Sequence, residues 1–244
     1  MAEGRVARRV VVVRRRGRRV AEASVPEEAE VRVLHNSRVV ATLAASPVAL
    51  EELAVGHLAL QGRVRARADV GRVHVRRWHG AWHVVVEGRA WPPVPPKPRL
   101  PRGPALAPAQ VRVLMKALVQ GAAMYREGGG VHTSALASPQ GIVALAADIG
   151  KVNTLDRLAG RQLLEGLERA PILLTTGRLT GAVVARALAL GCSLLVSHSG
   201  PTSRALALAE ARGASLLGYA RGGGFTIYTG ARRVAGRRAP KRAA

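Results

Sequence analysis

The first ninety residues alternate hydrophobic and polar positions in short runs, which is the pattern of half-buried β-strands. Residues 30–44, EVRVLHNSRVVATLA, contain two β-rich runs on either side of the polar triplet HNS. Residues 71–88, GRVHVRRWHGAWHVVVEG, contain two more around an HG pair. The pattern therefore predicts two β-hairpins.

One helix is predicted between these hairpins. Ser46 is in a suitable position for the N-cap, Pro47 suits the first helical position, and Gly62 ends the pattern. A stripe of residues at helical spacing gives this helix a face for the core: Leu50, Leu53, Ala54, His57 and Leu58. Residues 21–91 are therefore predicted to form a small α+β unit.

A proline-rich stretch follows. Residues 92–108 contain eight of the 14 prolines, and proline lacks the amide donor that a helix interior or a central strand needs. This stretch is predicted to be a linker or an exposed loop. The next segment, AQVRVLMKALVQGAAMYREGGG, predicts a helix that ends at Gly128.

The C-terminal half predicts an α/β domain over residues 109–230. Short apolar runs at 141–148, 171–176, 192–199 and 214–220 read as strands, and a glycine-containing turn and an amphipathic helix follow each of the first three. This alternation predicts a layer of largely parallel strands. Thr180 and Thr202 fit as helix N-caps, Gly191 and Gly213 fit as helix ends, and the run FTIYT would close the sheet.

The charge of the chain is strongly positive. The formal net charge is +23, and 14 of the 38 basic residues lie in residues 1–20 and 231–244, which are predicted to be basic tails. Two interpretations of the tails stay open: they bind nucleic acid, or they belong to a solvated surface biased towards arginine. The remainder is still basic, which favours an anionic ligand or partner. Aromatic residues make up only 3% of the chain, so base stacking on an aromatic platform is poorly supported.

The single cysteine, Cys192, excludes an internal disulfide, a cysteine-based zinc knuckle and a CxxC redox pair. Its place at the start of an apolar strand favours a small buried core residue over a reactive thiol. No apolar run reaches 18 residues, and the valines at 10–13 are too few for a signal-peptide core. We therefore expect a cytoplasmic protein without membrane contact.

Turns that follow parallel strands gather at one edge of a sheet, where ligands usually bind. Glycines, helix N-termini and three cations, Lys151, Arg178 and Arg221, suit a phosphate-bearing ligand at that edge. Asp148 and Asp156 suit a sugar hydroxyl or the amino edge of guanine. The alternative is that these are ordinary capping turns, in which Asn153 caps a helix. His132 fits equally as a ligand contact or as a polar residue near the end of an element.

Several motifs in the same order resemble the FdhD family of formate dehydrogenase accessory proteins: VHTSALA, ADIGKVNTLDRLAG, TTGRLTGAVVARALALG, SHSGPTSRALALAEARG and LLGYARGGGFTIYT. The resemblance covers residues 25–234. It implies a cytidine-deaminase-like α/β domain that binds a molybdenum or tungsten bis-molybdopterin guanine dinucleotide. It also implies a cysteine desulfurase as sulfur donor, a formate dehydrogenase-type oxidoreductase as recipient, and pairing as a homodimer.

The segment that matches the family's cofactor-binding stretch is Tyr219 to Gly224. Together with the turns, the resemblance gives the predicted cofactor-binding set: His132, Asp148, Gly150, Lys151, Asn153, Asp156, Gly177, Arg178, Ser199, Thr202, Tyr219, Ala220, Arg221, Gly222, Gly223 and Gly224. In this interpretation the three cations contact phosphates, while Asp148, Asn153 and Asp156 orient the nucleoside or brace the turns.

Two departures from family patterns limit the expected chemistry. The family carries persulfide sulfur on a CxxC loop, but the corresponding stretch here, RLPRGPALAP, has no cysteine. Zinc-dependent deamination would need HxE and PCxxC motifs, and His132 is followed by Thr133 and Ser134, so no zinc is expected. The function predicted is cofactor binding in support of sulfuration or delivery. The alternative is a nucleic-acid-binding module that uses arginine-rich ends.

Overall fold

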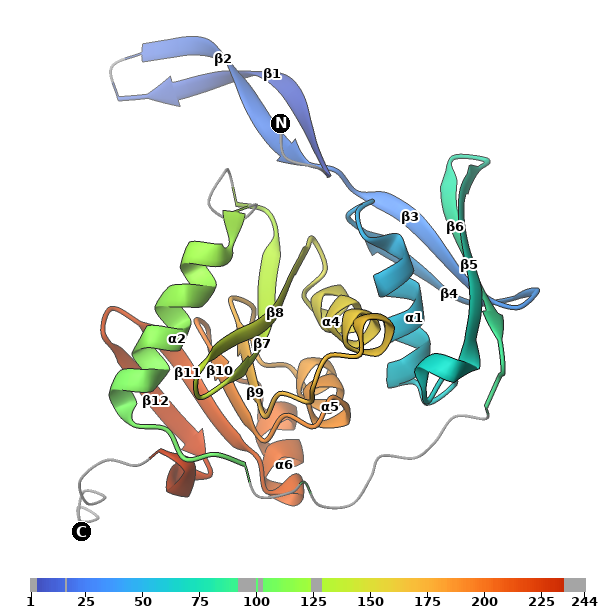
Figure 1. Cartoon of the computed structure of the whole chain (residues 1–244). Helices are drawn as coiled ribbons and strands as arrows, with labels where there is room; N and C mark the ends of the chain where they lie inside the picture. The colour runs from blue at the N-terminus through green and yellow to red at the C-terminus, as the bar shows by residue number, and fades with distance from the viewer. Residues whose placement is uncertain (1–3, 16, 92–99, 101–102, 124–128, 235–244) are drawn as a thin grey trace.

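The computed structural model describes residues 4–15, 17–91, 100, 103–123 and 129–234, and these residues form three β-sheets with helices (Figure 1). Parts of the predicted linker, 92–99 and 101–102, lie outside the described residues. So do residues 235–244 of the predicted C-terminal tail. The architecture is mixed α/β.

The N-terminal unit is a four-stranded sheet covered on one face by a helix. Both predicted hairpins are confirmed, because β3 pairs with β4 and β5 with β6, each in antiparallel register. The sheet order is β4-β3-β6-β5. Its elements are β3 (Ala29–His35), β4 (Arg38–Ala45), α1 (Leu50–Leu60), η1 (Arg67–Asp69), β5 (Val70–Trp78) and β6 (Ala81–Gly88).

The start of helix α1 differs from the prediction. Ala49 is the N-cap residue, with a left-handed φ of 42°, and Ser46 lies before it with its side chain fully buried. Ser46 does not cap α1 because its hydroxyl accepts a hydrogen bond from the backbone of Ile149, in the other half of the chain. A contact across the molecule has thus replaced a local one.

The C-terminal unit is a six-stranded sheet in the order β12-β11-β10-β9-β7-β8. The prediction of largely parallel strands holds only for β9, β10 and β11, whereas β7, β8 and β12 pair with their neighbours in antiparallel fashion. The strands are β7 (His132–Ser138), β8 (Gly141–Asp148), β9 (Ile172–Thr175), β10 (Leu194–Ser197), β11 (Ser215–Arg221) and β12 (Gly224–Thr229). Because β7 is antiparallel to both β8 and β9, strand β8 still runs in the same direction as β9 to β11.

Two hydrophobic clusters cover the two faces of this sheet. Helices α4, α5 and α6 contribute to one cluster, and α2 contributes to the other. Helix α2 ends at Gly121, and the predicted helix end at Gly128 lies outside the described residues. Thr180 and Thr202 occupy the predicted N-cap positions, and Gly213 caps the end of α6 with a φ of 68°. The helices are α2 (Pro108–Gly121), α4 (Lys151–Glu165), α5 (Gly181–Ala189), α6 (Ser203–Arg212) and η2 (Ala231–Arg233).

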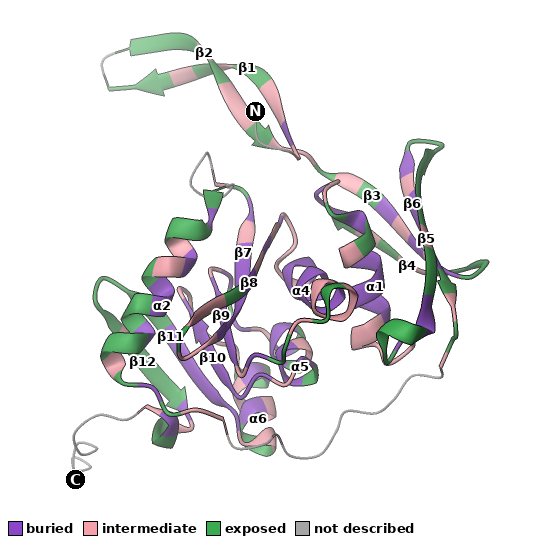
Figure 2. Ribbon diagram, in the orientation of Figure 1, coloured by how far each residue is buried: buried purple, intermediate pink, exposed green. Residues whose placement is uncertain are grey.

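The predicted N-terminal basic tail folds instead into a β-hairpin. Strands β1 (Arg5–Arg14) and β2 (Gly17–Pro26) pair along ten residues each and extend away from the two larger units (Figures 1 and 2). Interspersed valines give these strands β propensity that a count of charges does not reveal. The segment is therefore an arm, and below it is called the β1–β2 arm.

Helices α1 and α4 join the two larger units by close backbone packing. Gly56 of α1 lies against the Asp156 carbonyl, and Gly160 of α4 lies against the Glu52 carbonyl. A Cβ atom at either glycine would overlap backbone of the opposite helix. The pair of glycines therefore sets how closely the two units approach.

Candidate functional site

The turns predicted to form a site lie at one edge of the six-stranded sheet. The ends of β8, β9, β10 and β11 meet there with the start of β7, whose His132 pairs with Asp148. Backbone hydrogen bonds connect the successive turns: His198 donates to the Thr175 carbonyl at 2.9 Å, and Tyr219 donates to the Ser199 carbonyl at 3.0 Å. The structure thus brings these segments together despite their separation in the sequence.

Lys151, His132 and Gly177 meet at the β8–α4 end of this edge. A Cβ atom at Gly177 would lie 3.2 Å from the imidazole Nδ1 of His132 and 3.2 Å from Cβ of Lys151. Such separations are tight for carbon, so the absence of a side chain leaves room between the lysine and the histidine. Arg178, the next residue, is exposed.

Arg221 and Tyr219 form the other end of the edge. The Arg221 guanidinium lies 5.7 Å from the centre of the Tyr219 ring, which is 46% exposed. Tyr219 has a φ of 51°, an uncommon left-handed conformation for an aromatic residue. Its hydroxyl would lie 2.7 Å from a Cβ at Gly200, so that glycine makes room for the tyrosine. A strained aromatic residue beside an exposed cation is typical of a binding surface.

Two helices begin at this edge without a side-chain cap. Helix α4 starts after Gly150, which has no side chain, and helix α5 starts after Thr180, whose side chain accepts no hydrogen bond from the helix. The first amides of a helix and its dipole favour a negative charge. Helix α6 differs, because the Thr202 hydroxyl accepts from the Ala205 amide at 3.4 Å.

The glycine run at 222–224 has a local explanation. Gly222 and Gly223 connect β11 to β12 in a two-residue turn with φ values of 60° and 85°, which the primed hairpin turns require. Nothing lies within 4 Å of a Cβ at any of the three glycines, so the turn is open. Ala220 is buried against the cluster that contains α2. Turn geometry alone therefore accounts for these two glycines.

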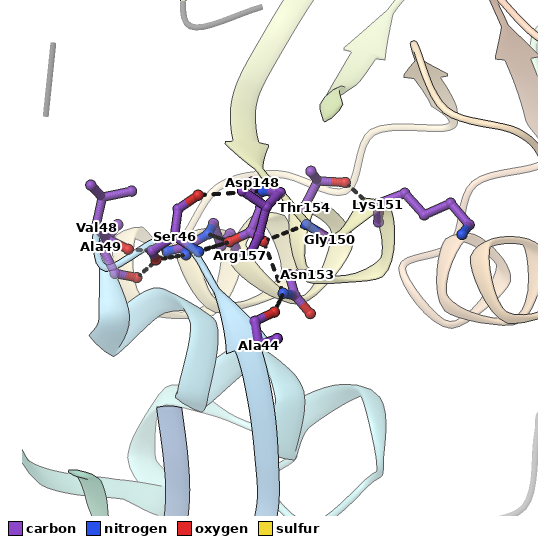
Figure 3. Close-up of polar contacts among 11 residues, drawn as sticks. Ala44, Ser46, Val48, Ala49, Asp148, Gly150, Lys151, Asn153, Thr154 and Arg157 are labelled. Carbon is purple, nitrogen blue, oxygen red and sulfur yellow. Dashed lines mark hydrogen bonds and ion pairs between the residues drawn. The ribbon is translucent and has the colours of Figure 1, made fainter. Parts of the chain in front are cut away.

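Asp148 points away from this surface into the junction between the two larger units, where it is fully buried (Figure 3). One carboxylate oxygen accepts from the Gly150 amide at 2.7 Å and from the Asn153 side chain at 2.9 Å. The other accepts from Arg157 at 2.6 Å and from the Ser46 amide at 3.3 Å. Two roles were predicted for Asp148, which are to orient a nucleoside or to brace the turns. These contacts support the second role.

Arg157 is a buried residue that sequence reasoning missed. Its guanidinium binds Asp148 and also donates to the carbonyls of Ser46, Val48 and Ala49, which lead into helix α1. Asn153 extends the junction, since its side chain donates to the Ala44 carbonyl at 2.8 Å. The sequence did not indicate these contacts of Arg157, because the carbonyls that it binds lie more than 100 residues away in the chain.

Asp156 is buried in a second polar group at the same junction. Its carboxylate contacts the Nδ1 of His57 at 2.9 Å and the Arg186 guanidinium at 2.7 Å. His57 also contacts Gln61 at 2.7 Å. Asp156 thus joins α1, α4 and α5. In Figure 3 the long side chain of Lys151 extends away from the buried group around Asp148.

Comparisons with known proteins show the family of this chain. The model of the FdhD/NarQ family matches residues 89–235, which is more than half of the chain.

The chain belongs to the FdhD/NarQ family.

Two FdhD relatives align over most of its length. The sulfur carrier protein FdhD of Bacillus subtilis is 28% identical over 83% of this chain and 87% of its own. The sulfur carrier protein FdhD of Geobacillus kaustophilus is 28% identical over 93% of this chain and 96% of its own. A crystal structure of a proposed formate dehydrogenase accessory protein from Desulfotalea psychrophila has the same fold. Its TM-score is 0.82 at 23% identity, over 95% of this chain and 100% of that one.

Cys192 is a core residue in this FdhD/NarQ protein. It is fully buried in the cluster beneath α4, α5 and α6, and its thiol donates to the Ala170 carbonyl at 3.4 Å. Burial raises the pKa of the Cys192 thiol to about 12. The thiolate that persulfide chemistry needs is therefore scarce at neutral pH. Among the described helices, none combines the length and the apolar character needed to cross a membrane.

Two histidines at the edge are expected to take up protons when an anion binds. Burial lowers the pKa of His132, and nearby Lys151 lowers it further. Burial and Arg221 lower the pKa of His198 in the same way. Both pKa values are thus lowered from the usual histidine value, which favours the neutral form of both rings. A bound phosphate would favour the charged rings and raise both pKa values.

Calorimetry of GDP binding at pH 6.5, in two buffers of different ionisation enthalpy, measures this uptake. The unmodified protein is expected to take up more protons than a His132→Asn/His198→Asn variant. Protonation of GDP itself is common to both proteins, so the difference reports the two histidines. Equal uptake by the two proteins would show that the anion binds away from them.

Proposed function

We propose that this protein binds a molybdenum or tungsten bis-molybdopterin guanine dinucleotide at the edge of the six-stranded sheet and supports its sulfuration or its delivery to a formate dehydrogenase-type oxidoreductase. One observation carries the proposal: Lys151 and Arg221 lie at the two ends of an edge where two helices begin without a side-chain cap. Phosphate groups are the ligands that such an edge favours. Relatives that carry the name sulfur carrier protein support the proposed pathway.

The residues present fit the anionic arms of such a dinucleotide. Lys151 and the first amides of α4 would hold one phosphate region, and Arg221 would hold another. The exposed Tyr219 ring offers an apolar face beside Arg221. Asp148 and Asp156 are buried in the junction and engaged there, so in this proposal they position the turns and leave the ligand to the exposed residues.

Sulfur is proposed to come from a cysteine on a partner protein. Cys192 is the only cysteine, it is fully buried, and burial raises its pKa to about 12. A persulfide carrier needs an accessible thiolate. We therefore assign this chain the roles of holding the cofactor and receiving a donor such as a cysteine desulfurase, whose own cysteine would carry the sulfur.

Titration of GDP, as a stand-in for the guanine dinucleotide arms, tests this function. An Arg221→Ala variant is expected to bind GDP about tenfold more weakly or worse, because a charge-assisted hydrogen bond contributes about 1.5–3 kcal/mol. Arg112→Ala is the matched control, since Arg112 is exposed on helix α2, which packs on the sheet and does not begin at the edge. Equal affinity of the Arg221→Ala and unmodified proteins would contradict the proposed site.

A further inference from the structure

The four-stranded sheet of the N-terminal unit has one open face. Figure 1 shows helix α1 and the C-terminal unit on the same side of this sheet. Val31 and Val33 of β3 and Val84 of β6 belong to the hydrophobic cluster that contains α1. Because successive side chains of a strand point to opposite faces, Arg32 and His83 lie on the other face. No described helix covers that outer face (Figure 1).

A basic row crosses the outer face. Arg32 of β3 is paired with His83 of β6, and His83 is paired with Arg76 of β5, so the three side chains lie side by side across three strands. Arg32 binds Glu30 at 2.7 Å, but these side chains are 41% and 48% exposed, and exposed pairs contribute little stability. Burial lowers the pKa of His83, and the charges of Arg32 and Arg76 lower it further. The row therefore offers a positive field to a phosphate group.

His83 carries an unsatisfied polar atom in this row. The residue is 5% exposed, and its Nε2 has no hydrogen-bond partner among the described residues. The ring of Trp78 packs edge-on against the imidazole, with 5.2 Å between the ring centres, and Trp78 is itself 52% exposed. The Arg76 guanidinium lies 6.0 Å from the centre of the Trp78 ring. Buried polar atoms normally have partners, so a ligand group that displaces these surface side chains would supply the missing one.

An exposed indole beside a row of cations combines the two contacts that single-stranded nucleic acid uses, which are stacking of a base and neutralisation of phosphates. Aromatic residues are few in this chain, yet one of them is exposed next to two arginines. A duplex keeps the faces of its bases stacked inside, so it would leave the indole without a partner. The net charge of +23 extends the positive field beyond this face, which favours a long polyanion over a short acidic peptide.

From these observations we propose that the outer face of the N-terminal sheet binds single-stranded nucleic acid, with a base stacked on Trp78 and phosphates bound by Arg32 and Arg76. The activity goes beyond the proposed function, whose ligand lies at the edge of the other sheet. The low exposure of His83 places it beneath the strand, where its Nε2 would meet a sugar or phosphate oxygen once the Trp78 ring turns towards the base.

The test measures binding of a labelled oligouridine of about 12 nucleotides to the full chain by fluorescence anisotropy at low salt. Trp78→Leu is expected to weaken binding about tenfold, because it removes the stacked ring, whereas Trp78→Phe keeps a ring and is expected to stay within about threefold. Arg32→Gln/Arg76→Gln is expected to weaken binding about tenfold. This double variant should also reduce the slope of log Kd against log salt by about 1.4, which corresponds to two phosphate contacts.

Arg77→Gln is the matched control for the arginines. Arg77 follows Arg76 in β5 and is exposed as well, but it is paired with Trp82, which packs against the cluster that contains α1. Arg77 therefore lies on the opposite face, and its replacement is expected to have little effect. Oligouridine is also expected to quench part of the tryptophan fluorescence of the unmodified protein but not that of Trp78→Phe, which a purely structural role of Trp78 would not produce.

Each protein is also titrated with GDP, which separates this inference from the proposed function. Lost oligouridine affinity with retained GDP affinity in the sheet variants supports the proposal. Equal oligouridine affinity of Trp78→Leu and the unmodified protein would overturn it, as would no binding by the unmodified protein. A duplex that binds as tightly and tolerates the sheet variants would assign nucleic acid to the β1–β2 arm instead, and tighter binding of a polyglutamate peptide of equal charge would assign the face to an acidic protein. Failure of the unmodified protein to bind GDP would count against the proposed function alone.

Discussion

A Gly56→Ala variant is expected to lose about 3 kcal/mol or more of unfolding free energy. Helix propensity alone would favour alanine over glycine by about 1 kcal/mol. The expected loss of unfolding free energy therefore comes from packing. The added methyl group would overlap the Asp156 carbonyl and the Gly160 amide, which are backbone atoms of helix α4. Since backbone cannot turn aside as a side chain can, the two helices would have to separate, and overpacking of this kind typically costs about 1–3 kcal/mol, occasionally more.

Urea denaturation of the two proteins measures the difference. Gly160→Ala is expected to behave in the same way, because its methyl group would overlap the Glu52 carbonyl of helix α1. Gly224→Ala serves as the control for stability, since nothing lies within 4 Å of its Cβ position. If Gly56→Ala were as stable as the unmodified protein, the helices would have to lie farther apart than the structure places them.

Replacing Asp148 by asparagine is expected to cost about 3–5 kcal/mol of unfolding free energy, because it leaves the buried Arg157 guanidinium without its counter-charge. Arg157 is 2% exposed and Asp148 fully buried, so water cannot replace the lost partner. The variant also weakens the anchor of the Gly150 amide and of the Asn153 side chain. The folded fraction should still bind GDP, because the carboxylate points into the junction between the units.

Glu165→Gln provides a matched control, since it makes the same change from acid to amide in an exposed ion pair. Glu165 lies 3.0 Å from Arg161, and both side chains are more than a third exposed. Exposed pairs of this type contribute about 0.3–0.5 kcal/mol, so the control should change stability little. Urea denaturation measures the stability of each variant, and titration of the folded protein with GDP measures its affinity. Together they separate a structural role of Asp148 from a role in binding the ligand. Loss of GDP affinity in fully folded Asp148→Asn would restore the nucleoside-orienting role predicted from the sequence.

Local patterns predicted those parts of the fold that local interactions determine. The hairpins around HNS and HG, the helix ends at Gly191 and Gly213, and the strand–turn–helix rhythm depend on neighbouring residues, and the structure has them. The insertion of β7 between β8 and β9 could not be predicted, because its antiparallel pairing with both strands depends on the tertiary fold. The β1–β2 arm was not predicted, because the many arginines of this segment indicated a basic tail, whereas its valines favour β-strands.

The exposed and buried members of the candidate site differ in how far sequence could predict them. The sequence placed Lys151, Arg178 and Arg221 on one sheet edge, where the structure also has them. It could not distinguish a carboxylate that faces a ligand from one that faces an arginine. Asp148 has partners at Ser46 and Arg157, and only the tertiary fold brings these three residues together. The role of Arg157 and the pairing of His57 with Asp156 could not be predicted for the same reason.

The contacts of Arg157 bear on how this protein can change through evolution. Its guanidinium binds three carbonyls that precede helix α1, and the turn that leads to Lys151 is fixed by the same group of contacts. The N-terminal unit therefore supports the turn that precedes Lys151 and cannot be exchanged as a separate module. A recombinant chain that took its N-terminal unit from a distant relative would have to bring a compatible helix α4 with it. Substitutions on the two sides of the junction are accordingly expected to arise together, although about 100 residues separate them in the sequence.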